Sequence, residues 1–249
     1  MTNFVIFGTA RSGSQLLVSL LNSHPAICCE LEILRLGQWR RPLRPLVYLW
    51  QRIPYPYFIY RSRLMRKRTQ KGLYGFKLFP YQVAAPASVV REMHRRGWKI
   101  IHLQRRSLFQ QTLSGAVAGQ TRWWHGRIGV TVTPPIITID PKAFLASLLD
   151  GHNQREQCIH ALTNVEHLDI LYEADLEDEA RWAATVERIC SHLGVANAPV
   201  RTRLTKPWSQ SYREIVSNYD ELVKVFEENS FLRDALCSGE EASSFKSDV

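Results

Sequence analysis

Apolar runs and segments of helical periodicity alternate along most of the chain. Residues 4–7 form an unbroken apolar run, residues 8–14 are small and polar, and leucines at helical spacing follow in residues 15–22. This pattern predicts a strand, a loop and a helix. The same criteria predict further strands at residues 74–79, 99–103 and 167–172, and helices at residues 87–96, 108–118, 178–193 and about 212–229. Strands that alternate with helices favour an α/β fold, in which helices cover both faces of a parallel sheet.

Two insertions interrupt this alternation. Residues 35–71 are basic and aromatic with four prolines, and residues 119–138 contain adjacent tryptophans and a Pro-Pro pair. We expect both to form walls of an acceptor site, because long loops and ligands gather at the carboxyl ends of the strands in α/β sheets. With 249 residues, the sequence predicts one large domain over residues 1–236 and a disordered tail, rich in Ser and Glu, over residues 237–249.

Charge is distributed unevenly along the chain. The net charge is +9, yet residues 33–91 contain thirteen Lys and Arg and no Asp or Glu, whereas residues 150–249 contain ten basic and nineteen acidic residues. We expect the basic half to face an anionic ligand, and the alternative is that the two halves attract each other. At 45% hydrophobic and 22% charged residues, the composition excludes collagen-like, low-complexity and largely disordered classes.

The five cysteines form no Cys-x-x-Cys pair and no cluster with zinc spacing. We therefore expect reduced thiols and no metal site. The sequence has no apolar run of about 18 residues and no leader with a basic and an apolar region, which favours a cytoplasmic protein.

Residues 8–14, Gly-Thr-Ala-Arg-Ser-Gly-Ser, join the first predicted strand to the first predicted helix. Backbone N–H groups converge at such a junction and bind anions. The spacing of Gly8 and Gly13 matches a nucleotide-binding P-loop, but Ser14 and Gln15 stand where that loop has Lys and a hydroxyl residue. Arg11 is able to supply the missing positive charge. The alternative is that the glycines only form a tight turn.

A second candidate phosphate contact lies at the end of the strand predicted at residues 99–103. Arg106 follows this strand, and Ser114 stands eight residues later, two turns into the next helix. Such a pair can bind one phosphate from two sides. The alternative is an exposed arginine and a serine bonded within its own helix turn.

Together these segments resemble the sulfotransferases that use 3′-phosphoadenosine 5′-phosphosulfate (PAPS), in their bacterial and carbohydrate-type branch. The resemblance rests on Arg11-Ser12-Gly13-Ser14 with Leu16-Leu17 and Asn22-Ser23-His24-Pro25, on Arg106 through Ser114, and on Glu32-Ile33-Leu34, Gly75-Phe76-Lys77-Leu78, Leu171-Tyr172-Glu173 and Ser217-Asn218-Tyr219. Two positions depart from the family pattern: Gln15 replaces a small hydroxyl residue, and Ser107-Leu108 replaces Asp/Asn-Pro. The resemblance implies a single-domain, P-loop-like fold of three layers.

The resemblance also implies a cofactor site for PAPS. The 5′-phosphosulfate would be bound by Arg11, Ser12, Gly13, Ser14 and Gln15, and the 3′-phosphate by Arg106 and Ser114. Sulfuryl transfer to a hydroxyl needs a base, cations for the leaving phosphate and in-line geometry, and it requires no metal.

For the base, the resemblance points to Glu32. No other carboxylate follows Glu32 for 59 residues, Glu30 is the runner-up, and His24 is a further candidate. The alternatives are that Glu32 only pairs with a neighbouring arginine and that His24 ends a helix and bonds the backbone.

Lys77 is a second candidate cation beside Arg11, and the alternative is a lysine that only extends from a strand end. Tyr172 and its neighbour Glu173 would order the phosphate loop from behind.

Other functions remain open at this point. A P-loop kinase would share the fold but needs a lysine, a magnesium-binding hydroxyl and an acidic partner. A nucleic-acid-binding module would use residues 35–71, with Trp39, Tyr48, Trp50, Tyr55, Tyr57 and Tyr60 as stacking surfaces. The same basic segment suits contact with an anionic membrane. For the sulfotransferase that the resemblance implies, we expect the acceptor to be a hydroxyl of a sugar, a glycolipid or a small secondary metabolite, and the sequence does not choose among them. The expected lack of an anchor favours a bacterial enzyme over a Golgi enzyme.

Overall fold

The computed structural model describes residues 2–35, 41–124, 126–127, 129, 133–205, 208, 210–230 and 232. Their contacts divide the chain into two compact units. The first consists of Met1–Gln104 and Gln154–Thr202, and the second of Arg105–Asn153 and Arg203–Val249. The tail at residues 237–249, Trp39 and the fifth cysteine, Cys237, lie outside the described residues.

The first unit is built on a parallel sheet. In the described residues it has five strands in the order β2-β3-β1-β4-β6. Their bounds are Ile27–Glu30 for β2, Leu73–Leu78 for β3, Asn3–Gly8 for β1, Lys99–Gln104 for β4 and Leu168–Leu171 for β6. Val5 of the central strand β1 lies opposite Phe76 on one side and Ile100 on the other. Because β1 is buried on both faces, its sequence is a continuous apolar run without alternation.

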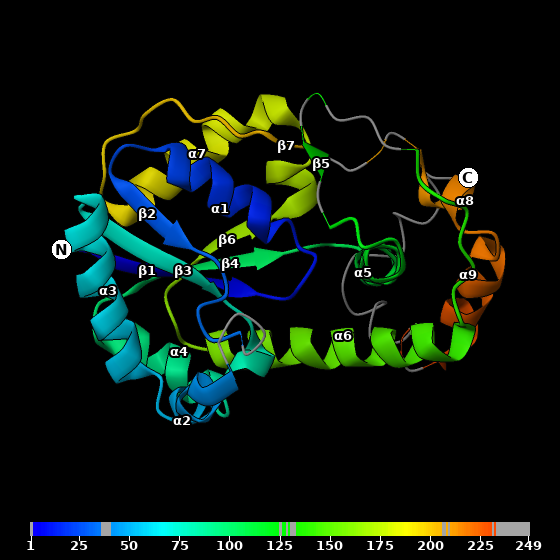
Figure 1. Ribbon diagram of the computed structural model, residues 1–249, viewed down its shortest axis with the longest axis horizontal. Helices are drawn as coiled ribbons and strands as arrows, with labels where there is room; N and C mark the ends of the chain where they lie inside the picture. Colours follow the sequence, from blue (N-terminus) through cyan, green and yellow to red (C-terminus); the bar gives the residue numbers. More distant parts are fainter. Residues whose placement is uncertain are drawn as a thin grey trace. The chain divides into compact units, whose positions relative to one another are not determined.

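Helices cover both faces of this sheet (Figure 1). Phe4 and Ile6 of β1 pack against α1 (Ser14–Ser23) and α7 (Trp182–Leu193). Val5 and Phe7 point to the opposite face, where α3 (Tyr55–Thr69), α4 (Pro86–Arg95) and the end of α6 (Pro141–Leu162) cover the sheet. The alternation follows from the two-residue period of a strand.

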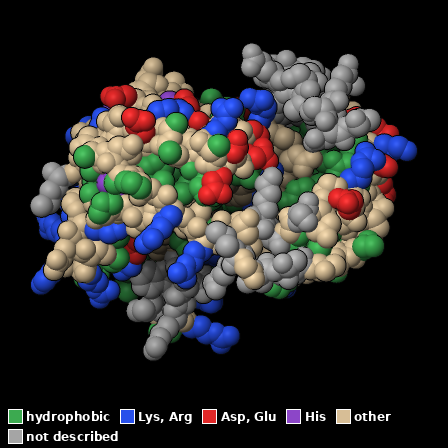
Figure 2. Space-filling view, turned by 90° about the horizontal axis from the view of Figure 1, so that it is seen from above, with side chains coloured by type: hydrophobic (Ala, Val, Ile, Leu, Met, Phe, Trp, Pro, Cys, Tyr) green, Lys and Arg blue, Asp and Glu red, His purple; other side chains and the backbone are tan. Residues whose placement is uncertain are grey.

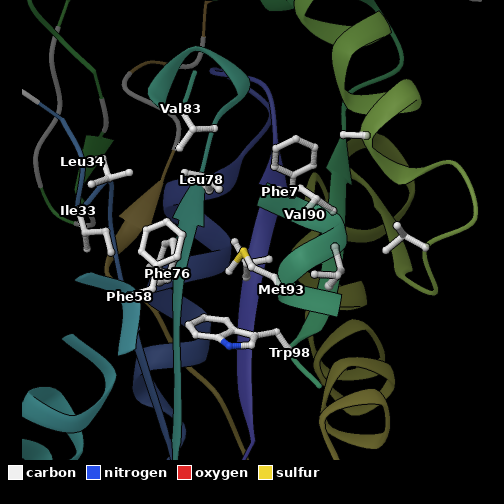
Figure 3. Packing of buried hydrophobic residues seen from close by; sticks show 14 of the residues in the cluster. Phe7, Ile33, Leu34, Phe58, Phe76, Leu78, Val83, Val90, Met93 and Trp98 are labelled. Atoms are coloured by element: carbon white, nitrogen blue, oxygen red, sulfur yellow. The ribbon is translucent and has the colours of Figure 1, made fainter. Parts of the chain in front are cut away.

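Figure 3 shows the packing on this second face. Phe58 of α3, Phe76 of β3 and Trp98 meet in a compact aromatic group around Met93 of α4. The ring centroids of Phe58 and Phe76 lie 4.7 Å apart, and those of Phe76 and Trp98 lie 5.8 Å apart. Each such side chain contributes about 1.5–3 kcal/mol by burial, so this group holds α3 and α4 on the sheet.

The second unit is mainly helical. It contains α5 (Leu108–Thr121), the first part of α6, α8 (Tyr212–Ile215) and α9 (Tyr219–Glu228), with a two-stranded antiparallel pair of β5 (Gly126–Arg127) and β7 (Leu204–Thr205). Phe109 lies at the centre of its core, in edge-on contact with Phe144, Tyr219 and Phe226.

The predicted fold class is confirmed, and most predicted strands and helices lie within a few residues of the observed ones. Gly194 ends α7 in the left-handed conformation expected of a C-cap. Two predicted helices are wrong in extent. The segment 178–193 begins with a short 3-10 turn (Glu179–Arg181) before α7, and the segment 212–229 is broken between α8 and α9. The sequence patterns missed β2 and α6 entirely.

The predicted insertion at residues 35–71 is largely helical where it is described. A 3-10 turn (Arg41–Leu43) leads into α2 (Arg44–Arg52), and α3 follows. Residues 36–40 of this insertion and His125 in the second insertion lie outside the described residues. The predicted single domain over residues 1–236 stays a prediction.

Three further features bear on the sequence predictions. Within the described part of the chain, Cys28, Cys29, Cys158 and Cys190 are free and buried. Lys and Arg side chains lie beside Asp and Glu side chains on the face shown in Figure 2, so this face does not carry a single sign of charge. No helix in the described ranges combines the length and the hydropathy needed to cross a bilayer.

Candidate functional site

The loop at residues 9–13 connects β1 to α1 through two left-handed residues. Arg11 has a φ of 62° and Gly13 a φ of 83°. Ser12 is fully buried, and its hydroxyl donates a hydrogen bond of 2.8 Å to the carbonyl of Thr9, which fixes the turn from inside. The loop therefore has a defined conformation.

The N-terminus of α1 faces this loop without a capping group. The helix follows Gly13, which has no capping side chain, and its first turn contains no acidic residue. A Cβ added to Gly13 would lie 2.4 Å from the ring of Tyr172, so only glycine allows this ring to pack against the loop. The predicted position of Tyr172 behind the loop agrees with this contact. Free N–H groups at a helix start and the positive end of the helix dipole favour an anion here.

Lys77 extends from β3 to the start of α1. Its Nζ lies 3.5 Å from the hydroxyl of Ser14 and 3.1 Å from a carboxylate oxygen of Glu32, and its side chain is only 7% exposed. Burial lowers the pKa of Lys77 from the ordinary lysine value, Glu32 opposes this shift, and the charge of Arg11 adds to it. Lys77 is thus a buried cation beside the start of α1 rather than a lysine that extends into solvent.

Glu32 is held by two neighbours. One carboxylate oxygen pairs with Lys77, and the other accepts a hydrogen bond of 2.9 Å from the side-chain amide of Gln82. The parallel pairing of β2 with β3 places Glu30 opposite Phe76, so the chain after β2 runs beside the end of β3. Lys77 is one ion-pair partner of Glu32, and the expected alternative, a pair with a neighbouring arginine, stays open. We call Ser14, Lys77, Glu32 and Gln82 the Glu32 cluster.

Glu30 has different surroundings. Arg61 donates two hydrogen bonds to its carboxylate, at 2.8 and 2.5 Å, and the hydroxyl of Tyr74 donates a third at 2.7 Å. The hydrogen bond with Glu30 raises the pKa of Arg61 above its usual range. Burial is the main cause that raises the pKa of Tyr74, so both groups keep their protons at neutral pH. We call Glu30, Arg61 and Tyr74 the Glu30 cluster.

His24 has a structural role. It is buried, its Nδ1 accepts a hydrogen bond from the backbone N–H of Ala26, and its Nε2 lies 3.0 Å from the carbonyl of Ala196. With Nδ1 as acceptor, Nε2 carries the proton and donates it to this carbonyl. Both ring nitrogens are therefore engaged, which favours the alternative expected for His24 over a role as base.

The remaining candidates belong to the second unit. Arg106 is exposed and follows β4, and Ser114 is buried within α5. Ser107, which departs from the family pattern, accepts a hydrogen bond of 3.1 Å from the backbone N–H of Gln110 and caps α5. The binding of a 3′-phosphate by Arg106 and Ser114 stays a prediction.

The sequence did not single out Gln82. It lies in a 3-10 turn (Pro80–Gln82) directly after β3, and its side chain also accepts a hydrogen bond of 3.0 Å from the backbone N–H of Phe79. The only signal was its position shortly after the Gly-Phe-Lys-Leu segment, since an isolated glutamine in a turn has no distinctive pattern.

One group within the described residues has the composition of a metal site. His102, His167 and Asp169 offer ligand atoms within 4.8 Å of one another, on and beside the paired strands β4 and β6. Nδ1 of His102 lies 2.9 Å from Asp169, so these side chains already satisfy each other by hydrogen bonding. None of them belongs to the Glu32 cluster.

No protein-family profile and no curated protein sequence matches this chain. A sulfotransferase from Alicyclobacillus acidocaldarius matches in structure with a TM-score of 0.50 at 16% identity, over 95% of this chain and 93% of that one. The sulfotransferase domain of the Synechococcus PCC 7002 olefin synthase matches with a TM-score of 0.52 at 15% identity, over 100% of this chain and 96% of that domain.

The chain has the sulfotransferase fold. This likeness extends over almost the whole chain, and it confirms the fold that the resemblance of short motifs implied. At this level of identity the comparison concerns the fold, so the function has to be argued from the residues of this chain.

Proposed function

We propose that the protein is a PAPS-dependent sulfotransferase that uses Glu32 as its base. The observation that carries the proposal is the Glu32 cluster, in which one buried lysine links the candidate base to the start of the phosphate-loop helix. In sulfuryl transfer the acceptor hydroxyl and the leaving phosphate lie on opposite sides of the same sulfur. A base for the acceptor proton and a cation for the leaving phosphate are therefore needed close together.

The donor side of the site is suited to a phosphosulfate. The N–H groups of residues 12–15 lie at the uncapped start of α1. Arg11 in the loop and Lys77, whose Nζ lies 3.5 Å from the hydroxyl of Ser14, add positive charge beside them. In the proposed site these groups bind the 5′-phosphosulfate and stabilise the charge that develops on the bridging oxygen. Arg106 and Ser114 are proposed to bind the 3′-phosphate.

The acceptor side depends on Glu32. Its carboxylate takes the proton of the acceptor hydroxyl while the acceptor oxygen forms a bond to sulfur. The bond between sulfur and the bridging oxygen breaks at the same time, and the electron pair remains on the departing 3′,5′-bisphosphoadenosine. Lys77 contacts Glu32 and Ser14, and is therefore placed to hold the base and to neutralise the leaving phosphate.

A P-loop kinase is the second candidate, because it shares the loop geometry. The loop of this chain has Ser14 and Gln15 where a kinase needs the phosphate-binding lysine and a magnesium-binding hydroxyl residue. The lysine near this position comes instead from β3, and it is paired with Glu32. This arrangement favours sulfuryl transfer.

Titration calorimetry distinguishes the two candidates. We expect the protein to bind 3′,5′-bisphosphoadenosine more tightly than AMP or Mg-ATP, because only the first ligand carries the 3′-phosphate assigned to Arg106 and Ser114. Binding of Mg-ATP with equal affinity, or a requirement for magnesium, would replace the sulfotransferase proposal with the kinase.

A further inference from the structure

A hollow of about 440 Å³ lies next to the Glu32 cluster. Its lining comes from α2 and from the segment that follows β3: Tyr48, Leu49, Gln51, Arg52, Tyr81, Gln82, Val83 and Ala84. Gln82 is shared, since it lines the hollow and donates its amide hydrogen to Glu32. A molecule in this hollow therefore lies one side chain away from the proposed base. Its walls are mostly aromatic and aliphatic, with Arg52 as a charged group.

Helix α2 exposes apolar side chains beside this hollow, and one of them, Leu49, also lines it. Of its residues only Val47 is buried. Leu46 and Leu49 are exposed, and so is Ile53 directly after the helix. Their spacing of three and four residues places them on one face. Val47 and Trp50, which stacks on Tyr57, pack α2 against its own unit. Leu46, Leu49 and Ile53 belong to none of the buried clusters, so this face of a short helix is left without a packed partner among the described residues. An external apolar partner would stabilise it.

Positive charge accompanies this apolar face. Arg41, Arg44 and Arg52 are exposed, and none of the ion pairs formed by the described residues involves them. The surrounding segment, residues 33–91, has no carboxylate that would neutralise them. Apolar side chains flanked by arginines are the composition of a helix that lies at an anionic membrane surface.

We propose that α2 docks on an anionic membrane surface and that the acceptor is an amphipathic, lipid-linked hydroxyl compound. The apolar face of Leu46, Leu49 and Ile53 enters the interface, and the arginines contact lipid phosphates. The hydroxyl-bearing part of the acceptor enters through the hollow and passes Gln82 towards Glu32. This inference rests on the proposed sulfotransferase function and selects the lipid-linked acceptor over a free sugar. Aliphatic side chains dominate the exposed face, which favours a bilayer over nucleic acid.

Vesicle co-sedimentation of the full chain tests the docking surface. We expect binding to vesicles of three parts phosphatidylcholine and one part phosphatidylglycerol to exceed binding to pure phosphatidylcholine on the order of a hundredfold, from three arginines near the surface. Raising the salt concentration to about 0.5 M should remove most of this difference, because it screens the arginines.

A matched pair of variants locates the surface. Ile53 is 60% exposed beside α2, and Ile159 is 57% exposed on α6 in the same unit. Ile53→Asp should weaken vesicle binding about tenfold or more, whereas Ile159→Asp should leave it unchanged. Neither residue contacts the Glu32 cluster or lines the hollow, and thermal melts of both variants verify folding.

Three results would overturn the inference. The first is no binding to anionic vesicles, and the second is an equal loss in both variants. The third is a dimer in sedimentation velocity that Ile53→Asp dissociates, which would assign the face to a second copy of the chain.

Binding of 3′,5′-bisphosphoadenosine in the same preparations keeps the two proposals apart. Nucleotide binding without vesicle binding refutes only the membrane surface, and vesicle binding without nucleotide binding refutes the sulfotransferase.

Discussion

The Glu30 and Glu32 clusters begin two residues apart and lead to different parts of the first unit. Glu30 is enclosed by Arg61 from α3 and Tyr74 from β3, and these groups supply three hydrogen bonds to its carboxylate. Glu32 is held by Lys77 and Gln82, and Lys77 continues to the start of α1. The first cluster ties a helix to the sheet. The second cluster extends from the start of α1 to the hollow that Gln82 lines.

In the proposed site, the two carboxylates differ in what their partners also contact. Glu30 and Glu32 have nearly equal exposure, at 16% and 15% of the side chain. Exposure alone therefore does not distinguish the base. The partner of Glu32 is a buried cation beside an uncapped helix N-terminus, and this is where a leaving phosphate is stabilised best.

The largest expected effect is that of Glu32→Gln. The amide keeps the shape and accepts a hydrogen bond, but it no longer takes a proton, so kcat should fall about 10²- to 10⁴-fold. Affinity for 3′,5′-bisphosphoadenosine should change little, because this loss belongs to the chemical step. A transfer assay with labelled donor and calorimetry with the product measure the two quantities.

Glu30→Gln and His24→Asn are the matched controls for this loss. Both should keep most of the activity per folded molecule. If Glu32→Gln retained more than about a tenth of wild-type activity while one control lost two orders of magnitude, the base would be the residue changed in that control.

The next effect concerns Lys77, which lies between the proposed base Glu32 and the start of α1. Lys77→Met removes the charge and keeps much of the volume, and we expect kcat to fall about 10²- to 10³-fold, as for a lost electrostatic contact to a developing charge. Unlike Glu32→Gln, this variant should also weaken binding of the bisphosphate. An unchanged affinity would show that Lys77 contacts only Glu32.

The pKa of Lys77 adds a test without mutation. Since burial lowers this pKa below the ordinary lysine value, the charged form is lost at a lower pH than in an exposed lysine. Affinity for the bisphosphate should therefore fall as the pH rises towards 10, and Lys77→Arg should move the fall to higher pH. Equal pH profiles for both proteins would contradict this assignment.

Arg106→Ala tests the contact assigned to the second unit. One charge-assisted hydrogen bond to a phosphate contributes about 1.5–3 kcal/mol, so affinity for 3′,5′-bisphosphoadenosine should fall roughly tenfold to a hundredfold. Affinity for AMP, which lacks the 3′-phosphate, should stay the same. Arg105→Ala is the neighbouring control, and an equal effect on both nucleotides would remove Arg106 from the 3′-phosphate site.

The Glu30 cluster should respond through stability instead of activity. Glu30→Gln leaves Arg61 without its carboxylate partner, and since the pair is partly exposed we expect a loss of about 1–3 kcal/mol in the free energy of unfolding. The melting temperature should fall by about 2–4 °C per kcal/mol. A stable Glu30→Gln variant with reduced kcat would place Glu30 in the active site and remove the distinction between the clusters.

The strongest sequence patterns predicted the sheet, because buried parallel strands are continuous apolar runs. β1 and β4 were predictable for this reason. β2 was missed because Ile27–Glu30 is only four residues long and contains two cysteines. The 22-residue helix α6 was missed because one part packs in the second unit and its end packs in the first, so no single apolar stripe runs along it.

The candidate site was predictable only in part. A glycine loop after a strand indicated the anion site. Glu32 stood out as a candidate base because no other carboxylate follows it for 59 residues. The link between them was not predictable from spacing, because it depends on β2 pairing with β3 and bringing residues 32 and 77 together across 45 positions of sequence. The contact between Gln82 and Glu32 depends on the same pairing of strands. Gln82 lies in a 3-10 turn that no sequence pattern predicted.

The smallest expected effect is that of Gln82→Ala, which separates positioning from chemistry within the Glu32 cluster. Gln82 contacts neither the loop nor Lys77 through any hydrogen bond among the described residues. Its side-chain nitrogen orients one oxygen of Glu32, and its side-chain oxygen accepts a hydrogen bond from the backbone N–H of Phe79. Loss of one such hydrogen bond is worth about 0.5–1.5 kcal/mol, which corresponds to a decrease in kcat of roughly twofold to tenfold. Bisphosphate affinity should be unaffected, and Gln82→Glu should be worse than Gln82→Ala, since a second carboxylate would repel Glu32 and compete for Lys77. If Gln82→Ala lowered kcat as far as Glu32→Gln does, Gln82 would contact the reacting atoms directly. In that case the hollow would be part of the catalytic centre itself.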